Sequence, residues 1–355
     1  MAVQDQFEEL LQTVLKENSS DLHLTVGPRP SIRIAGSLIE LVRYPSLTPP
    51  AVKDLSFTML SREQEEHFVK QKELDLSYAY RDKARFRVNI FYQRGFMGAA
   101  LRLIPTKIRD FTELNLPPII AEFCDRQQGF LLIVGPTGHG KTTTLGAMVY
   151  SINHKRNDHI ITIEDPIEYL FTSDRAIVDQ REIGADTESF HRALRSMFRE
   201  DVDVGMIGEM RDPETISTAV TAAETGHLIL SSLHTNNAAQ TIDRVIDSFG
   251  AEQQGQIRAQ LAGTLIAILS QRLVPRVSGG LIPAVEVMIG TPAIRTLIRE
   301  NKVHEIDLVI ETSSDQGMIS LNRSLVDLVR RGEITLEQAS LYSLNPSELA
   351  SLLRI

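Results

Sequence analysis

The segment Gly135–Thr142 carries residue types at a spacing suited to phosphate binding. It reads Gly-Pro-Thr-Gly-His-Gly-Lys-Thr and fits the pattern G-x-x-x-x-G-K-[ST]. The glycines let successive backbone N–H groups turn toward phosphate oxygens. Lys141 is expected to reach the β- and γ-phosphates, and Thr142 to offer its hydroxyl to Mg²⁺. The expected nucleotide contacts are Gly135, Pro136, Thr137, Gly138, His139, Gly140, Lys141, Thr142 and Thr143.

The neighbours of this loop support that interpretation. The apolar run Phe130–Val134 precedes it and indicates a strand, while Thr143–Met148 follows it and indicates a helix. A helix N-terminus at the end of the loop adds the positive end of its dipole to the phosphate site. A plain glycine-rich turn is the alternative, and the strand–loop–helix context disfavours it. The sequence therefore predicts a nucleoside triphosphate site.

Hydrolysis needs acidic groups as well, and two acidic segments follow apolar runs. Ile160–Ile163 leads into Glu164, and Val204–Ile207 leads into Glu209. Open α/β sheets bind ligands at the carboxyl ends of their strands. Acids in such places are often only helix caps, but two of them in one chain with a phosphate-binding loop favour catalysis. We expect Glu209 to act as general base or to orient water, and Glu164 to contact metal or water.

Histidine and arginine side chains are further candidates, each with a structural alternative. His227 and His234 are seven residues apart, so on one strand they face opposite ways, which argues against a shared metal site. Strand-end histidines bonded to nearby backbone are the alternative. Arg195 and Arg199 follow an i, i+4 spacing on a helix expected to bury the apolar stripe Phe190, Leu194, Met197 and Phe198. Solvated surface is the alternative for these two arginines.

The organisation of the chain predicts two domains. Helical spacing near the start and strand-like runs at 21–26, 31–34, 84–92 and 98–104 predict a small antiparallel α+β domain over residues 1–105. On the strand at 84–92, one face should carry Phe86, Val88, Ile90 and Tyr92. Residues 106–115 are the expected linker. Residues 116–355 alternate apolar strands with amphipathic helices, which is typical of a parallel α/β sheet.

Composition excludes several classes. The single cysteine, Cys124, cannot form a disulfide framework or a Cys-rich zinc site, and we expect it to be a small buried hydrophobe in a cytoplasmic protein. The longest apolar stretch, Leu261–Leu269, is half the length of a membrane span and is interpreted as a buried helix. The net charge of −9, without a basic run, argues against nucleic-acid binding.

Several motifs together resemble one family. The chain is similar to the ATPases of the type II and type IV secretion superfamily, in particular those that retract type IV pili in twitching motility. The resemblance runs from Ser20 to Gly332 and rests on Arg85–Asn89, Glu164–Glu168, Gly208–Asp212, Thr225–Thr235 and Thr291–Glu300. It implies a PAS-like N-terminal domain, a RecA-like P-loop ATPase domain with C-terminal helices, and a homohexamer. It also implies a peripheral location at the inner membrane, without membrane insertion, on the pilus platform protein.

The resemblance also implies roles for single residues. Glu209 becomes the catalytic carboxylate, and Glu164 lies near metal and water, so that Thr142, Glu209 and Glu164 would hold Mg²⁺ partly through water. His227 and His234 become paired sensors of the nucleotide state. The arginines that would contact ATP are Arg87 and Arg102, less surely Arg85, from the N-terminal domain, together with Arg195 and Arg199.

This sequence departs from the family pattern at four places. His139 stands where serine is usual, Val202 where proline is usual, Gly205 within an aliphatic strand, and Thr296 where asparagine is usual. The alternatives to a retraction motor are a divergent accessory paralogue, or an extension or type II secretion ATPase. The latter two usually carry a four-cysteine zinc insertion, which this chain cannot build.

In the helix predicted after Thr291, Ile294, Leu297 and Ile298 give one apolar face, and Arg295 and Arg299 lie opposite it. We expect that replacing both arginines with alanine leaves the fold and most ATPase activity intact. By the resemblance, the same change should abolish retraction.

Overall fold

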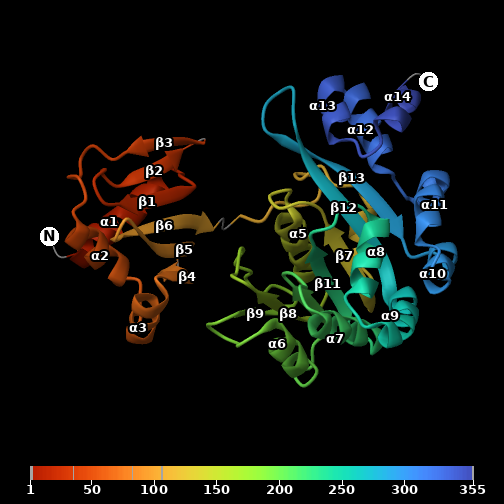
Figure 1. Ribbon diagram of the computed structural model, residues 1–355, viewed down its shortest axis with the longest axis horizontal. Helices are drawn as coiled ribbons and strands as arrows, with labels where there is room; N and C mark the ends of the chain where they lie inside the picture. Colours follow the sequence, from red (N-terminus) through yellow and green to blue (C-terminus); the bar gives the residue numbers. More distant parts are fainter. Residues whose placement is uncertain (1–2, 35, 82, 105–106, 354–355) are drawn as a thin grey trace. The chain divides into compact units, whose positions relative to one another are not determined.

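A computed structural model describes residues 3–34, 36–81, 83–104 and 107–353 (Figure 1). Its contacts divide the chain into two compact units. The first is Met1–Lys107 together with Glu168–Leu170, and the second is Ile108–Ile167 together with Phe171–Ile355. Residues 105–106, where the expected linker begins, lie outside the described residues.

The first unit is an antiparallel sheet with helices packed on it. Within the described residues this sheet has six strands in the order β3-β2-β1-β6-β5-β4. The strands are β1 (Asp21–Thr25), β2 (Ser31–Ile34), β3 (Ser37–Glu40), β4 (Glu73–Tyr80), β5 (Ala84–Gln93) and β6 (Phe96–Ile104). The helices are α1 (Val3–Lys16), α2 (Pro49–Phe57) and α3 (Arg62–Gln71). The expected α+β character is confirmed.

Alternation along β5 forms much of this core. Phe86, Val88 and Ile90 are fully buried, as the period of two predicts. Tyr92, expected on the same buried face, is 38% exposed, so that prediction is wrong. Its ring instead stacks on Phe68 of α3, with centroids 5.1 Å apart, because the end of β5 lies at the margin of the core.

The second unit is built on a mostly parallel sheet. Within the described residues its seven strands follow the order β13-β12-β7-β11-β10-β8-β9, and only β13 is antiparallel to its neighbour. The strands are β7 (Gly129–Val134), β8 (His159–Glu164), β9 (Ile177–Glu182), β10 (Val204–Ile207), β11 (Leu228–Leu233), β12 (Leu265–Pro275) and β13 (Leu281–Ile289). The expected α/β class is confirmed.

Helices accompany this sheet and continue beyond it toward the C-terminus (Figure 1). They are α4 (Ile119–Cys124), α5 (Lys141–Lys155), α6 (Phe190–Met197), α7 (Pro213–Glu224), α8 (Ala238–Asp247), α9 (Ala251–Thr264), α10 (Pro292–Arg299), α11 (Ile306–Thr312), α12 (Leu321–Arg330), α13 (Leu336–Tyr342) and α14 (Pro346–Leu353), with 3₁₀ turns η1 (Val303–Glu305) and η2 (Ser314–Gln316). The last three helices share a small apolar core of their own with β12 and β13.

Two predictions about apolar segments fail in this unit. Leu261–Leu269 is not one helix: α9 ends at Thr264, and β12 begins at Leu265. Burial on both faces hides the period that would separate a helix from a strand. Phe198, expected in the core, is 40% exposed because α6 ends at Met197. Cys124 is buried as expected, and burial raises the pKa of its thiol to about 12.

No helix among the described residues is both long and apolar enough to cross a membrane.

Candidate functional site

The loop Gly135–Gly140 connects β7 to α5 and needs glycine at both ends. Gly135 has φ +145°, and a Cβ there would lie 2.3 Å from the carbonyl oxygen of Gln271 on β12. Gly140, the residue before α5, has φ +81°, and its Cβ would lie 2.9 Å from the Gln271 amide nitrogen. Any side chain at either position would therefore push the loop away from β12.

Lys141 lies inside this loop. Its side chain is buried, and Nζ donates to the carbonyl oxygens of Gly135 at 2.9 Å and Pro136 at 3.0 Å. Nζ also lies 3.2 Å from Nδ1 of His234, at the end of β11. The ammonium group is thus held by two carbonyl oxygens of the loop and lies beside an imidazole nitrogen.

His234 connects the loop to Glu209. Its Nε2 lies 3.4 Å from one carboxylate oxygen of Glu209, which follows β10, and the other oxygen pairs with Arg211. Thr137 Oγ1 also lies 3.3 Å from His234 Nδ1. Because Nδ1 accepts a hydrogen bond from Lys141, the ring hydrogen lies on Nε2, which donates a hydrogen bond to Glu209. The arrangement joins the loop lysine, a histidine and a carboxylate in one row.

Glu164 lies one strand farther along the same sheet edge. It ends β8, which pairs in parallel with β10, and its side chain is buried. Its Oε1 accepts from Thr162 Oγ1 at 2.7 Å and from Gln180 Nε2 at 3.3 Å. The order β7-β11-β10-β8 therefore presents the loop, His234, Glu209 and Glu164 side by side, as expected for a ligand site at the carboxyl ends of parallel strands.

The expected Mg²⁺ site would use only three side chains, those of Thr142, Glu209 and Glu164. Among the residues that the structure describes, no three His, Cys, Asp or Glu side chains gather into a metal-binding group. Mg²⁺ commonly takes one or two protein oxygens and fills its remaining positions with phosphate oxygens and water. Thr142 in the first turn of α5 fits that pattern, since it stands next to the buried Lys141.

His227 does not join this cluster within the chain. It precedes β11, so the length of that strand, roughly 20 Å, separates it from His234. Its Nδ1 lies 2.9 Å from the carbonyl oxygen of Ala222, and its ring packs edge-on against Phe198. This is the backbone-bonded arrangement left open from the sequence, and a pairing of His227 with His234 inside one chain is excluded by the fold.

Five arginines are candidates for nucleotide contacts, and they are divided between the two units. Arg195 is exposed on α6, and Arg199 is exposed just beyond it. Arg102 of β6 donates from Nε to Asp21 at 2.9 Å, and Arg87 is its neighbour in register on β5. Arg85, on the same strand, donates to Ser77. These last three belong to the first unit, so their expected approach to phosphate stays a prediction.

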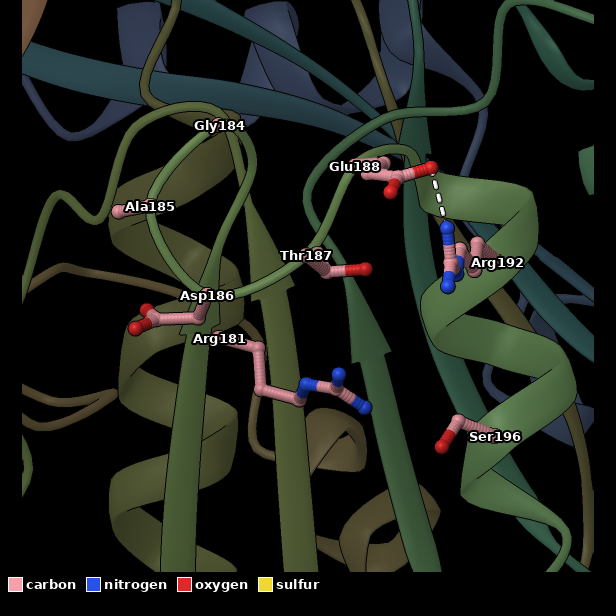
Figure 2. A pocket seen from close by; sticks show the side chains of 8 residues that line it. All are labelled: Arg181, Gly184, Ala185, Asp186, Thr187, Glu188, Arg192 and Ser196. Carbon is pink, nitrogen blue, oxygen red and sulfur yellow. Dashed lines mark ion pairs between the residues drawn. The ribbon is translucent and has the colours of Figure 1, made fainter. Parts of the chain in front are cut away.

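A hollow of about 660 Å³ follows the end of β9, the strand that pairs with β8 (Figure 2). Figure 2 shows Arg181 of β9 and Ser196 of α6 pointing toward one another. Both bond to Oε1 of Glu200, at 3.1 and 2.6 Å. The ion pair between Arg192 and Glu188 closes another side. Sequence reasoning missed these residues, since no motif marks them.

Sequence reasoning also missed Gln271. Its side-chain oxygen accepts from Thr144 Oγ1 at 2.8 Å, and its nitrogen donates to the carbonyl oxygen of His139 at 2.8 Å. Gln271 thus joins the first turn of α5 to the crown of the loop. A buried polar residue in an apolar strand was the available signal.

The structure accounts for two departures from the family pattern. A Cβ on Gly205 would lie 2.9 Å from both Ile229 of β11 and Met197 of α6, so glycine here lets α6 pack closely. Val202 is buried in the same core.

The segment after Thr291 forms α10 with the expected apolar face, but one of its arginines differs from expectation. Arg295 donates to three carbonyl oxygens, those of Gly290, Gly263 and Leu265, at 2.8, 3.0 and 3.2 Å. It therefore ties α10 to the junction of α9 and β12, which argues against the expectation that it is dispensable for the fold. Arg299 donates to Thr296 Oγ1 of the same helix at 3.0 Å and is exposed.

Comparison with known proteins agrees with this architecture. Residues 2–281 match the model of the family described as type II/IV secretion system protein. The chain is 44% identical to the type IV pilus retraction ATPase PilT of Pseudomonas aeruginosa, over 93% of this chain and 96% of that protein. It is 39% identical to the type IV pilus ATPase PilU of the same organism, over 99% and 92%.

A solved structure extends the likeness to three dimensions. The crystal structure of the pilus retraction motor PilT with bound ADP superposes with a TM-score of 0.91 at 44% identity, covering 97% of this chain and 98% of that one. The chain therefore belongs to the type II/IV secretion system protein family and is one of its ATPases.

Proposed function

We propose that this chain is a motor that hydrolyses ATP to retract type IV pili. The observation that carries the proposal is the row Lys141–His234–Glu209 at the carboxyl edge of the sheet. It would supply a cation for the phosphates from the start of α5 and a carboxylate for water from the segment after β10, with one imidazole between them. A module that only bound nucleotide would not need the carboxylate.

In this proposal each group has a separate task. The N–H groups of Gly138–Thr143 and the ammonium of Lys141 bind the β- and γ-phosphates. Glu209 orients the attacking water or accepts its proton, and His234 holds the Glu209 carboxylate in place. Mg²⁺, held by Thr142 and through water by Glu209 and Glu164, would neutralise phosphate charge.

Retraction is the output that the relatives favour. The name of PilT states pilus retraction, and that protein and this chain match over nearly their whole lengths. A divergent accessory paralogue is the second candidate, because PilU matches 99% of this chain. We place the chain as a homohexamer in the cytoplasm, peripheral to the inner membrane on the pilus platform protein. In such a ring Arg87, Arg102, Arg195, Arg199 and His227 would approach the nucleotide of a neighbouring subunit.

The test measures the ATPase activity of the purified chain together with its mass in solution. We expect Mg²⁺-dependent turnover by a species of six chains. Lys141→Ala should lower ATP affinity by ~10- to 100-fold, since it removes charge-assisted hydrogen bonds to phosphate. The matched control is Lys155→Ala at the other end of α5, where a partly exposed lysine forms a 3.9 Å ion pair with Asp125. Equal ATP affinity in both variants would contradict the phosphate site.

A further inference from the structure

His139 lies at the crown of the proposed phosphate loop, and two hydrogen bonds hold it, one to its ring and one to its backbone carbonyl oxygen. Nδ1 accepts a hydrogen bond from the backbone N–H of Leu273 on β12 at 2.8 Å. The carbonyl oxygen of the same residue accepts from Gln271 Nε2 at 2.8 Å. His139 thus makes hydrogen bonds to two residues of β12, Gln271 and Leu273. The crown of the loop cannot move away from β12 without breaking them.

The ring also reaches the C-terminal helices. Tyr342, the last residue of α13, packs edge-on against the His139 ring, with centroids 6.4 Å apart. The helix α13 contacts β12 and shares an apolar core with α12 and α14. His139 is therefore the place where the nucleotide loop, β12 and the C-terminal helices meet.

We propose that His139 is a positioning residue that fastens the loop crown to β12 and transmits the packing of α13 to the affinity for nucleotide. The proposal rests on the proposed function, because it assumes that the loop binds phosphate. Fastening keeps the backbone N–H groups of the loop in their phosphate-binding orientation before the nucleotide arrives, which saves ordering the loop on binding. Serine, the usual residue of the family at this position, carries no ring to contact α13.

The charges around the ring give the proposal a pH dependence. The described groups that face it are Lys141 of α5, Arg272 of β12 and Tyr342 of α13. Burial, Arg272 and Lys141 lower the pKa of His139 below its ordinary value. The ring is then neutral at neutral pH, as acceptance at Nδ1 requires.

The sign follows from linkage. When the crown is released from β12, the His139 imidazole binds a proton near the ordinary histidine pKa of ~6.5. When the crown is fastened, the imidazole binds a proton only at lower pH. Fastening is therefore fully present above that value, weakens as the pH falls through it, and is lost below the lowered pKa. Nucleotide affinity should fall over the same range.

The experiment measures the Kd for ADP by calorimetry between pH 5.5 and 8, on the full-length chain and its variants. His139→Asn keeps an acceptor near the position of Nδ1 but cannot be protonated there. It should bind ADP a few-fold more weakly than the wild type at pH 8, because it lacks the ring that contacts Tyr342, and it should lose the part of the pH dependence that His139 causes. His139→Ala should weaken binding by ~10-fold at pH 8, since it removes one hydrogen bond and the ring contact, and its difference from the wild type should shrink as the pH falls.

Two further variants test the contact with α13. Tyr342→Ala should weaken ADP binding by a few-fold, whereas Tyr342→Phe, which keeps the ring, should bind as the wild type does. His304→Ala, at a highly exposed histidine, is the control for loss of a surface imidazole.

The inference is overturned if His139→Ala binds ADP like the wild type at pH 8, or if His139→Asn keeps the full pH dependence, which would then belong to another group. A wild-type chain that binds no ADP would overturn the proposed function together with the inference. Unchanged affinity in the variants of a chain that does bind overturns the inference alone.

Discussion

Nδ1 of His234 lies 3.2 Å from Nζ of Lys141, so the residue that follows β11 contacts the lysine that begins α5. The other ring nitrogen faces Glu209, which follows the next strand, β10. A nucleotide phosphate that attracts Lys141 must weaken its bond to His234. The position of the ring, and with it the orientation of Glu209, therefore depends on what occupies the loop.

This relationship predicts that His234 acts mainly on turnover. His234→Ala should lower kcat by ~10²-fold, because Glu209 loses the hydrogen bond that orients it. His234→Gln, whose amide can donate to Glu209 but cannot also accept from Lys141, should lie between the alanine variant and the wild type. Steady-state ATPase kinetics measure both. If His234→Ala changes only KM, the histidine belongs to binding and not to the chemistry.

Glu209→Gln tests the carboxylate itself. The amide oxygen can still accept from His234, but the negative charge that would orient water or accept its proton is lost. We expect ATP binding to persist and turnover to fall by ~10²-fold or more. Glu214→Gln, an exposed glutamate in the first turn of α7, is the matched control. Wild-type turnover in the Glu209 variant would remove this residue from the mechanism.

Much of the fold is predictable because periods and turn residues are local. The strand at 84–92 and the strands that lead to Glu164 and Glu209 lie where the sequence places them. Segments buried on both faces carry no such period, which is why the α9–β12 boundary at Leu265 escapes prediction. The margins of a core are equally hidden, as Tyr92 and Phe198 illustrate.

Within the candidate site, residues belonging to motifs could be named in advance, whereas their supports could not. Lys141, Glu209 and His234 stand in patterns with a known spacing. Gln271 supports the loop from a strand more than 130 residues away in sequence, and only the pairing of β12 with β7 brings it there. The same holds for Arg295, whose three acceptors come from the chain before α10.

Gly205 gives a prediction about packing. Gly205→Val should destabilise the second unit by ~1–3 kcal/mol, because the added side chain overlaps Met197 and Ile229. Gly205→Ala should cost less, since the flexible ends of those two side chains can shift. Combining Gly205→Val with Met197→Ala should cost clearly less than the sum of the single changes, because one fills the space that the other opens. Chemical denaturation of the wild type, Gly205→Val, Met197→Ala and the double variant measures these free energies of unfolding. Strictly additive losses would show that residues 197 and 205 do not compete for space.

The two arginines of α10 should have separable effects. Arg295 bonds to backbone carbonyls before α10, whereas Arg299 bonds to a side chain of α10 itself. Arg295→Ala removes three hydrogen bonds from a charged group to backbone carbonyls, each worth ~1.5–3 kcal/mol when buried and less where exposed to solvent. We expect this variant to unfold at lower denaturant concentration and to lose ATPase activity with its fold. Arg295→Lys, which can reach only one of these acceptors at a time, should restore the fold in part.

Arg299→Ala is therefore the variant that isolates motor output. Its guanidinium bonds to Thr296 on the same helix and is exposed, so the fold and ATP hydrolysis should stay within about twofold of the wild type, as for most surface substitutions. If α10 passes the motion of the ring to the pilus machinery, cells that carry Arg299→Ala as their only copy should assemble pili but fail to twitch. Arg323→Ala, at an exposed arginine in the first turn of α12, controls for the loss of a surface charge. Normal twitching with Arg299→Ala would show that this side chain has no part in retraction, and would move the search to the neighbouring Thr296.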